Sequence, residues 1–162
     1  MRDLYALLLS LALIAGAVLV HFRALQLLSG WQVDMAASGR VKVLCIILGL
    51  IVAHAVEAAL FAAGYWIGES GLHLGRFIGV QPTTPLQYFY FSLETFTTQG
   101  VGDVYPVGPL RLLAALEPLA GLILIGWSTT FTFMVMSLDW RESLEARRPA
   151  QPQSLSGAPS GK

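Results

Sequence analysis

The residue types best suited to chemistry lie in one short run, Thr97-Thr98-Gln99-Gly100-Val101-Gly102-Asp103. Its two glycines alternate with residues that carry side chains, and glycine readily adopts backbone conformations that L-residues avoid. This alternation allows successive backbone carbonyls to point to one side, where they can replace the water shell of a cation. The sequence therefore predicts a strip of cation-binding peptide oxygens formed by Thr98, Gln99, Gly100, Val101 and Gly102, with the Thr98 hydroxyl at one end.

The composition places this run in a membrane protein. The chain has 162 residues, of which 55% are hydrophobic and 12% charged, and it is too apolar for an ordinary soluble domain of this size. Three segments, at about 4–22, 41–67 and 109–138, are long enough to cross a hydrocarbon core, which needs about 20 apolar residues. We expect the first to be a retained transmembrane helix and not a cleaved signal peptide.

A fourth apolar segment, residues 85–97, would extend only about 20 Å as a helix and cannot cross a bilayer. Thr84 followed by Pro85 is typical of a helix start. The pattern predicts a re-entrant helix followed by the glycine run, because irregular backbone at membrane depth must be buried in protein or line a water-filled cavity. A helix whose C-terminus points inward also places partial negative charge near a cation.

The motif Ser92-x-Glu94-Thr95-x-Thr97-Thr98-Gln99-Gly100-Val101-Gly102-Asp103 resembles the pore helix and filter of bacterial potassium channels, which read S-x-E-T-x-T-T-V-G-Y-G-D. The resemblance extends over about residues 49–137 and includes His54-x-x-Glu57 and Gly126-Trp127-Ser128-Thr129. It implies an all-α membrane protein of the pore-loop superfamily. Three transmembrane helices, the first an extra one, would be joined by a re-entrant pore helix and filter and assembled as a homotetramer.

The resemblance also implies roles for residues around the filter. Glu94 and Asp103 would share a proton, since two adjacent carboxyls cannot both stay ionised cheaply; separate solvation is the alternative. Thr95 and Thr97 would support the filter. The permeant ion would be K+, or also Na+, with no organic cofactor. The partners would be three further copies of the chain and membrane lipids, and the net charge of +0 gives no indication of nucleic acid.

Two filter positions depart from the potassium-channel pattern. Gln99 stands where Val or Ile is usual, and Val101 stands where Tyr or Phe is usual. In potassium channels these side chains pack behind the filter, and the Tyr hydroxyl helps to hold the width of the ring. Val101 has no hydroxyl, and a buried Gln99 amide needs partners such as Thr95, Glu94 or a neighbouring subunit. We therefore expect K+ to permeate with weaker discrimination against Na+.

Ionisable residues inside spans are functional candidates, because charge is costly in hydrocarbon. His54 and Glu57 share a helix face, and Glu117 lies on the last span. We expect these three residues to form a static hydrogen-bonded brace, and the alternative is a pH sensor, since histidine titrates near neutrality.

The last span carries further candidates. Gly121 and Gly126 are candidate gating hinges, with close helix packing as the alternative. Ile125, Thr129 and Phe133 follow one helical stripe and are expected to line the inner cavity. The single Cys45 is expected to be a small buried hydrophobic residue.

The placement of Lys and Arg predicts the orientation of the chain. The loop after the first span and the C-terminal tail carry most of these residues, so the positive-inside rule places the N-terminus outside and the C-terminus in the cytoplasm. We expect a multi-pass protein of a bacterial-type inner or plasma membrane. Residues 1–40 would form the N-terminal transmembrane helix and cytoplasmic connector, residues 41–140 the pore domain, and residues 141–162 a short disordered tail.

The leading functional hypothesis is a tetrameric channel that conducts potassium or monovalent cations passively. A non-conducting scaffold with a collapsed filter and a subunit of a potassium transporter are alternatives, although such transporters normally carry four glycine-bearing loops in one chain. We expect no enzyme activity, because the sequence has no G-x-S-x-G motif, no Cys/His metal spacing and no phosphate-binding loop.

Overall fold

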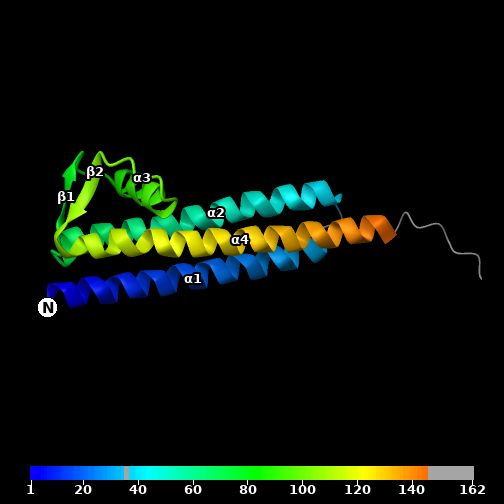
Figure 1. Cartoon of the computed structure of the whole chain (residues 1–162), viewed down its shortest axis with the longest axis horizontal. Coiled ribbons are helices and arrows are strands. Elements are labelled where there is room, and N and C mark those ends of the chain that lie inside the picture. Colours follow the sequence, from blue (N-terminus) through cyan, green and yellow to red (C-terminus); the bar gives the residue numbers. More distant parts are fainter. Residues whose placement is uncertain (35–36, 146–162) are drawn as a thin grey trace, which may run out of the picture.

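Three long helices lie side by side in the computed structural model, which describes residues 1–34 and 37–145 (Figure 1). They are α1 (Arg2–Asp34), α2 (Gly39–Trp66) and α4 (Arg111–Glu145). Each belongs to a segment long and apolar enough to cross a membrane. The three predicted spans and the all-α membrane class are confirmed.

Helix α1 is longer than predicted, because the segment expected to be a connector continues as helix to Asp34. Leu25 and Leu28 of this extension are buried in a cluster with Ile46 and Leu50 of α2. The Leu28 side chain occupies the space beside Gly49, where an added Cβ would meet it at 2.5 Å. Burial of this apolar face against α2 stabilises the extra helical turns.

Helix α4 also extends further than its predicted span. It continues to Glu145, so the first five residues of the segment expected to be a tail, 141–145, are helical. The rest of that segment, residues 146–162, lies outside the described residues.

The segment between α2 and α4 forms a compact cap at one end of the bundle (Figure 1). It contains a π-helical turn (Ile67–Gly71), strand β1 (Arg76–Gly79), helix α3 (Pro85–Phe96), strand β2 (Val104–Val107) and a 3-10 turn (Gly108–Leu110). The sequence predicted only a loop before α3, whereas the structure pairs β1 with β2 in antiparallel register, Phe77 opposite Pro106. The ribbon joins the chain before α3 to the chain after the glycine run.

Helix α3 begins at Pro85, as predicted. The side-chain Oε1 of Gln87 accepts a hydrogen bond from the backbone N–H of Thr84 at 3.0 Å, which satisfies an amide at the helix start. At the other end, the Thr97 hydroxyl donates to the carbonyl of Leu93 at 2.7 Å. Both ends of this 12-residue helix are therefore defined by local hydrogen bonds.

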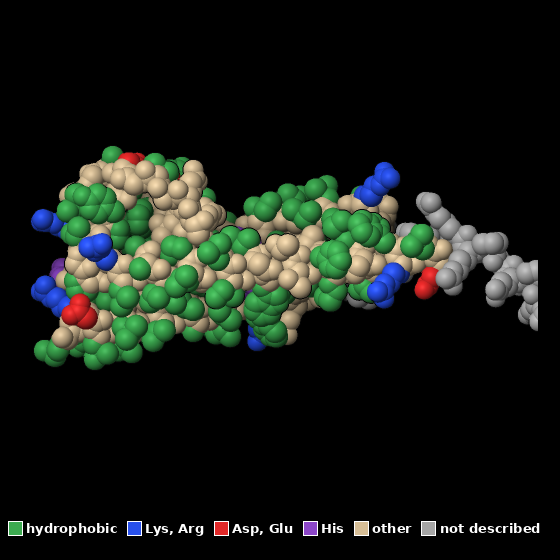
Figure 2. Space-filling model, viewed as in Figure 1, with side chains coloured by type: hydrophobic (Ala, Val, Ile, Leu, Met, Phe, Trp, Pro, Cys, Tyr) green, Lys and Arg blue, Asp and Glu red, His purple; other side chains and the backbone are tan. Residues whose placement is uncertain are grey.

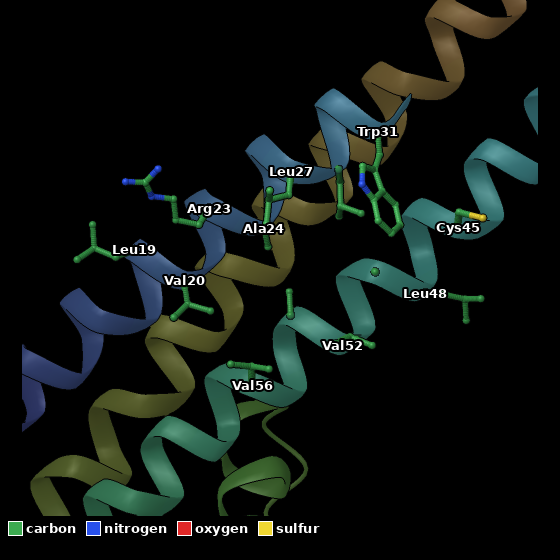
Figure 3. Close-up of a pocket in the computed structure, with 13 residues that line it drawn as sticks. Leu19, Val20, Arg23, Ala24, Leu27, Trp31, Cys45, Leu48, Val52 and Val56 are labelled. Atoms are coloured by element: carbon green, nitrogen blue, oxygen red, sulfur yellow. The ribbon is translucent and has the colours of Figure 1, made fainter. Parts of the chain in front are cut away.

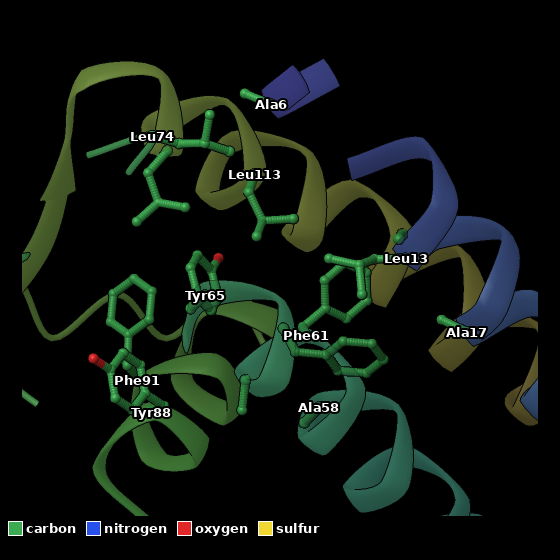
Figure 4. Close-up of a cluster of buried hydrophobic side chains, with 14 of the residues drawn as sticks. Ala6, Leu13, Ala17, Ala58, Phe61, Tyr65, Leu74, Tyr88, Phe91 and Leu113 are labelled. Carbon is green, nitrogen blue, oxygen red and sulfur yellow. The ribbon is translucent and has the colours of Figure 1, made fainter. Parts of the chain in front are cut away.

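An aromatic core holds α3 against the bundle (Figure 4). Phe91 of α3 packs edge-on against Tyr65 of α2 and Phe77 of β1, with ring centroids 5.0 and 4.9 Å apart. Tyr65 and Phe77 are both fully buried. Aromatic rings bury large apolar areas, and edge-to-face pairs add about 0.5–1.5 kcal/mol each. The core therefore fixes the re-entrant helix relative to α2 and the ribbon.

On the face shown in Figure 2, hydrophobic side chains are spread along the bundle, and most of the visible Lys and Arg side chains lie near its two ends. Trp66 at the end of α2 and Trp31 near the end of α1 are both exposed. Gly64 of α2 packs against Leu13 of α1, which sets how these two antiparallel helices are aligned. An apolar helix bundle with tryptophans towards its ends is typical of a protein that spans a bilayer.

A groove of about 800 Å³ opens between the C-terminal half of α1 and the N-terminal half of α2 (Figure 3). Apolar side chains make up nearly all of its lining, and Arg23 is the charged exception. Cys45, expected to be a small buried hydrophobic residue, is half-buried and forms part of this lining.

The two glycines predicted as hinges differ in their surroundings. A Cβ added to Gly121 would lie 2.1 Å from the carbonyl oxygen of Phe96, so α4 approaches the end of α3 as closely as backbone allows. A Cβ added to Gly126 would meet nothing within 4 Å. Gly121 therefore serves close packing of α4 against α3, and the hinge role of both glycines stays a prediction.

We predict that Gly121→Ala destabilises the protein by about 1–3 kcal/mol, because the added methyl group overpacks the contact between α3 and α4. The measurement is the thermal unfolding temperature of the purified protein in detergent. Gly126→Ala is the matched control, and it should leave this temperature unchanged or raise it slightly, since alanine is favoured over glycine in helices by up to about 1 kcal/mol. Equal unfolding temperatures for the two variants would contradict the packing role.

Candidate functional site

Left-handed backbone conformations recur at every second residue of the glycine run. Thr98, Gly100 and Gly102 have φ angles of 62°, 56° and 83°, while Gln99 and Val101 between them do not have positive φ. An added Cβ at Gly100 would meet nothing within 4 Å. Glycine is therefore needed at this position for its positive φ and not for lack of space. Positive φ at alternate residues is the backbone pattern that the predicted strip of carbonyls requires.

Thr98 is the strained member of the run. A β-branched residue with positive φ is an outlier, and such strain costs about 1–3 kcal/mol. Two hydrogen bonds tie this point to the end of α3: Thr98 N–H donates to the Thr95 carbonyl at 3.0 Å, and Gln99 N–H donates to the Glu94 carbonyl at 2.8 Å. The C-terminus of α3 therefore holds the start of the run in its strained conformation.

The run is free of contacts on one side of the single chain. All residues from Thr97 to Asp103 are exposed, and Val101 is 55% exposed. A cavity of about 360 Å³ lies between the run and its neighbours, and its lining includes Val101, Glu94 and Thr95, together with Pro118 of α4. Val101 therefore borders an open space between the run, α3 and α4.

The predicted supporting residues differ in how the single chain places them. Glu94 and Thr95 line this cavity, and Thr97 bonds back to α3. Asp103 is exposed, and its carbonyl accepts a hydrogen bond from Val80 N–H at 3.3 Å. No hydrogen bond joins the Glu94 and Asp103 side chains within the described part of the chain, so their shared proton stays a prediction.

Glu117 lies fully buried where α2, α3 and α4 meet. The Tyr65 hydroxyl donates to Glu117 Oε2 at 2.5 Å, and Ser92 Oγ lies 2.5 Å from Oε1. Ser92 Oγ also donates to the Ala58 carbonyl at 2.7 Å. A hydroxyl has one proton, so the geometry fits a protonated Glu117 that bonds to Ser92 while Ser92 donates to Ala58.

A second buried cluster joins α1, α2 and α4. Glu57 is fully buried, and its two carboxylate oxygens lie 2.9 Å from Nδ1 of His21 and 2.9 Å from Nδ1 of His54. His54 Nε2 is hydrogen-bonded to Ser128 Oγ, also at 2.9 Å. His54 and Glu57 thus form the predicted brace, whereas Glu117 belongs to the separate network with Tyr65. Sequence reasoning missed His21, although a histidine in the middle of an apolar span is itself a signal.

Glu69, in the turn after α2, is another residue that sequence reasoning did not select. Its carboxylate accepts hydrogen bonds from the Tyr88 hydroxyl at 2.6 Å and from Phe77 N–H at 3.1 Å. Burial, and then the Glu69 carboxylate, raise the pKa of Tyr88 to about 12, so the phenol keeps its proton and remains a donor. Glu69 therefore links strand β1 to helix α3.

The stripe of residues predicted to line an inner cavity lies in the middle and C-terminal part of α4. Ile125 is half-buried, and Thr129 and Phe133 are exposed in the single chain. The Thr129 hydroxyl donates to the Ile125 carbonyl at 3.0 Å. Pro118, which sequence reasoning did not select, removes one backbone hydrogen bond inside α4. It is a candidate bending point of this helix in addition to the glycines.

The fold and the site define a membrane protein with a re-entrant helix and a carbonyl-bearing loop between two spanning helices. A family model described as Ion channel matches residues 43–137. This is more than half of the chain, and the protein belongs to this ion channel family. The match begins after α1, so α1 and His21 lie outside the family unit. No curated protein and no solved structure matches the chain.

We predict that Tyr65→Phe destabilises the protein by about 1–3 kcal/mol, because it leaves a buried oxygen of Glu117 without its donor. Ser92→Ala should have a similar effect. The double variant should cost less than the sum of the two single changes, since both residues act on the same carboxyl. The measurement is thermal unfolding in detergent, with Tyr90→Phe, at a half-exposed position on α3, as the matched control. Strict additivity would contradict a shared network.

Proposed function

We propose that four copies of the chain surround a central axis and conduct potassium or other monovalent cations through a filter formed by Thr98 to Gly102. The alternating φ angles of Thr98, Gly100 and Gly102 carry this proposal. One chain supplies a single strip of aligned carbonyls, and a cation stripped of water needs oxygens on all sides. The exposure of the entire run in the single chain is consistent with an interface that further copies complete.

The orientation proposed for the channel places the glycine run on the outer side. Arg2, Arg76 and Arg111 belong to the end of the bundle that carries the ribbon, and Arg40, Lys42 and Arg141 belong to the other end (Figure 1). The positive-inside rule then places the C-terminal end of α4 in the cytoplasm, with the basic residues beyond it in the sequence adding to the asymmetry.

The departures at Gln99 and Val101 support weak discrimination between K+ and Na+. The side chain at 101 borders a cavity of about 360 Å³ next to α3 and α4. A tyrosine or phenylalanine at this position would occupy part of that space and brace the strand, whereas Val101 leaves the carbonyl cage less constrained. A deformable cage adapts more easily to a smaller ion.

We predict that the purified protein, reconstituted in liposomes, sustains a K+ flux and also a measurable Na+ flux. Fluorescence-based flux under opposed K+ and Na+ gradients measures both, and native mass spectrometry of the same preparation measures the oligomeric state. Gly100→Ala is a suitable control, because a Cβ at this positive φ strains the strip and should abolish flux. Absence of flux in a fourfold particle would favour a non-conducting scaffold, and an assembly other than fourfold would refute the proposed pore.

We predict that Gln99→Val with Val101→Tyr increases the K+/Na+ permeability ratio about tenfold, which corresponds to about 1.4 kcal/mol of differential stabilisation. The tyrosine would fill the cavity beside the strand, and the valine would remove an amide that needs polar partners. Reversal potentials in planar bilayers measure the ratio. Val80→Tyr, at an exposed position outside the run, controls for the added ring. Reversal potentials identical to those of the unsubstituted protein would refute this explanation of selectivity.

A further inference from the structure

We propose that His21, His54 and Glu57 form a binding site for a divalent transition metal ion such as Zn²⁺. Each residue offers one ligand atom, and the three atoms lie within 4.8 Å of one another. His21 comes from α1, whereas His54 and Glu57 come from α2, so a bound ion would join the extra helix to the ion channel unit. The three residues are not part of the proposed filter, and the site does not depend on the proposed selectivity.

The donor set identifies the class of ion. Two imidazoles and one carboxylate are characteristic of zinc sites with three protein ligands and an open fourth position. Imidazole nitrogen suits Zn²⁺, Cu²⁺, Ni²⁺ and iron, whereas Ca²⁺, Mg²⁺ and K+ prefer sites made of oxygen. The chemistry of the cluster therefore differs from that of the carbonyl strip.

The geometry is close to that of a bound site. Both Nδ1 atoms lie 2.9 Å from a separate oxygen of Glu57, as expected where protons bridge the pairs. A tetrahedral zinc site, with bonds of about 2.0–2.1 Å, separates its donors by about 3.4 Å. The three ligand atoms lie within 4.8 Å of one another, so changes of at most about 1.4 Å in their separations bring them to tetrahedral spacing around an ion that replaces the bridging protons.

The surroundings of His54 favour coordination through Nδ1. Ser128 Oγ lies 2.9 Å from His54 Nε2 and can accept its proton, which leaves the Nδ1 lone pair free for a metal. His21 Nε2 is buried and has no hydrogen-bond partner among the described residues, so the bond to Glu57 is its one polar contact there. When Nδ1 of His21 binds the ion, the proton that leaves Nδ1 moves to Nε2 of the same neutral ring, so His21 would be the ligand without a second hydrogen bond to orient it.

The position of the cluster gives the ion a large electrostatic effect. His21, Glu57 and Ser128 each lie near the middle of a spanning segment. The described residues place no Lys or Arg within ion-pair distance of Glu57, whose carboxylate is fully buried. A buried carboxylate needs compensating charge, and a divalent cation supplies it. The His54 side chain is 18% exposed, and it offers the route of entry.

A bound ion would act on the filter end of α3 through existing contacts. The His54 ring lies 5.8 Å from the Phe96 ring at the end of α3, and its other nitrogen contacts Ser128 of α4. Coordination would fix the His54 rotamer, and with it the packing of α2 against both helices. The expected result is a more rigid junction between α1 and the rest of the bundle.

Titration of the metal-free, full-length protein in detergent with ZnCl₂, measured by calorimetry, tests the site. We expect one bound ion per chain and a higher unfolding temperature. The chain has three histidines, and His73, in the loop before β1, is exposed and outside the cluster. His73→Ala should therefore bind zinc like the unsubstituted protein. Ser128→Ala should weaken binding about tenfold, as expected for a group that orients a ligand, and His21→Asn by more than that.

His21→Asn keeps a polar side chain at the buried position, which separates loss of a ligand from loss of folding. X-ray absorption of the zinc-loaded protein should show two imidazole ligands. Three results would overturn the site: no zinc binding, binding lost in His73→Ala, or binding unchanged in both His21→Asn and His54→Asn. If the unfolding temperature changed with pH but not with zinc, the cluster would bind protons and no metal ion. That result would also refute the proposal.

Discussion

The structure depends on one constraint, which is that every buried polar group between the helices must find its partner inside the protein. In a bilayer no water is available to satisfy an isolated carboxyl group, so Glu117 is stable only where other helices supply donors and acceptors. Tyr65 from α2 and Ser92 from α3 meet it, and Ser92 also reaches the Ala58 carbonyl. This network sets the depth and rotation of α3, and the end of α3 in turn holds the glycine run.

Steric contact and polar contact act on the same short stretch of α4. Gly121 lies one helical turn beyond Glu117, and its lack of a side chain lets α4 touch the carbonyl of Phe96. The carboxyl therefore fixes α3 near its middle, and the glycine fixes it at its C-terminus. On the opposite side, Glu69 and the β1–β2 ribbon hold the entry to α3 and the exit from the glycine run. The strained Thr98 lies between these fixed points.

Much of this arrangement could be predicted from sequence, because the relevant signals are local. Span length, the Thr84-Pro85 helix start and the alternation of Gly100 with Gly102 depend only on neighbouring residues. The ribbon could not be predicted in the same way, because each strand has four residues and depends on a partner far away in the chain. The continuation of α1 beyond the predicted span could not be fixed from sequence, since burial of Leu25 and Leu28 against α2 is a tertiary effect.

The side-chain networks show the same limit. Glu57 and Glu117 could be selected because an acid in an apolar span is unusual, but their partners depend on helix rotation, which periodicity alone does not determine. His54 and Glu57 were correctly paired because they lie three residues apart on one helix. His21, from a different helix, required the packing of α1 against α2 to be known. The roles of Glu94 and Asp103 depend on surfaces that a single chain leaves exposed.

The alignment of α1 with α2 also defines a hydrophobic thickness for the protein. Because Leu13 of α1 packs against Gly64 of the antiparallel α2, Trp66 of α2 lies at about the same height as the residue two positions before Leu13. Trp31 lies about 20 residues further along α1, which is about 30 Å of helix. Indole rings prefer the interface between lipid headgroups and acyl chains. The spacing equals the hydrocarbon thickness of an average bilayer, so the bundle can stand nearly upright there, and a thinner membrane would force it to tilt.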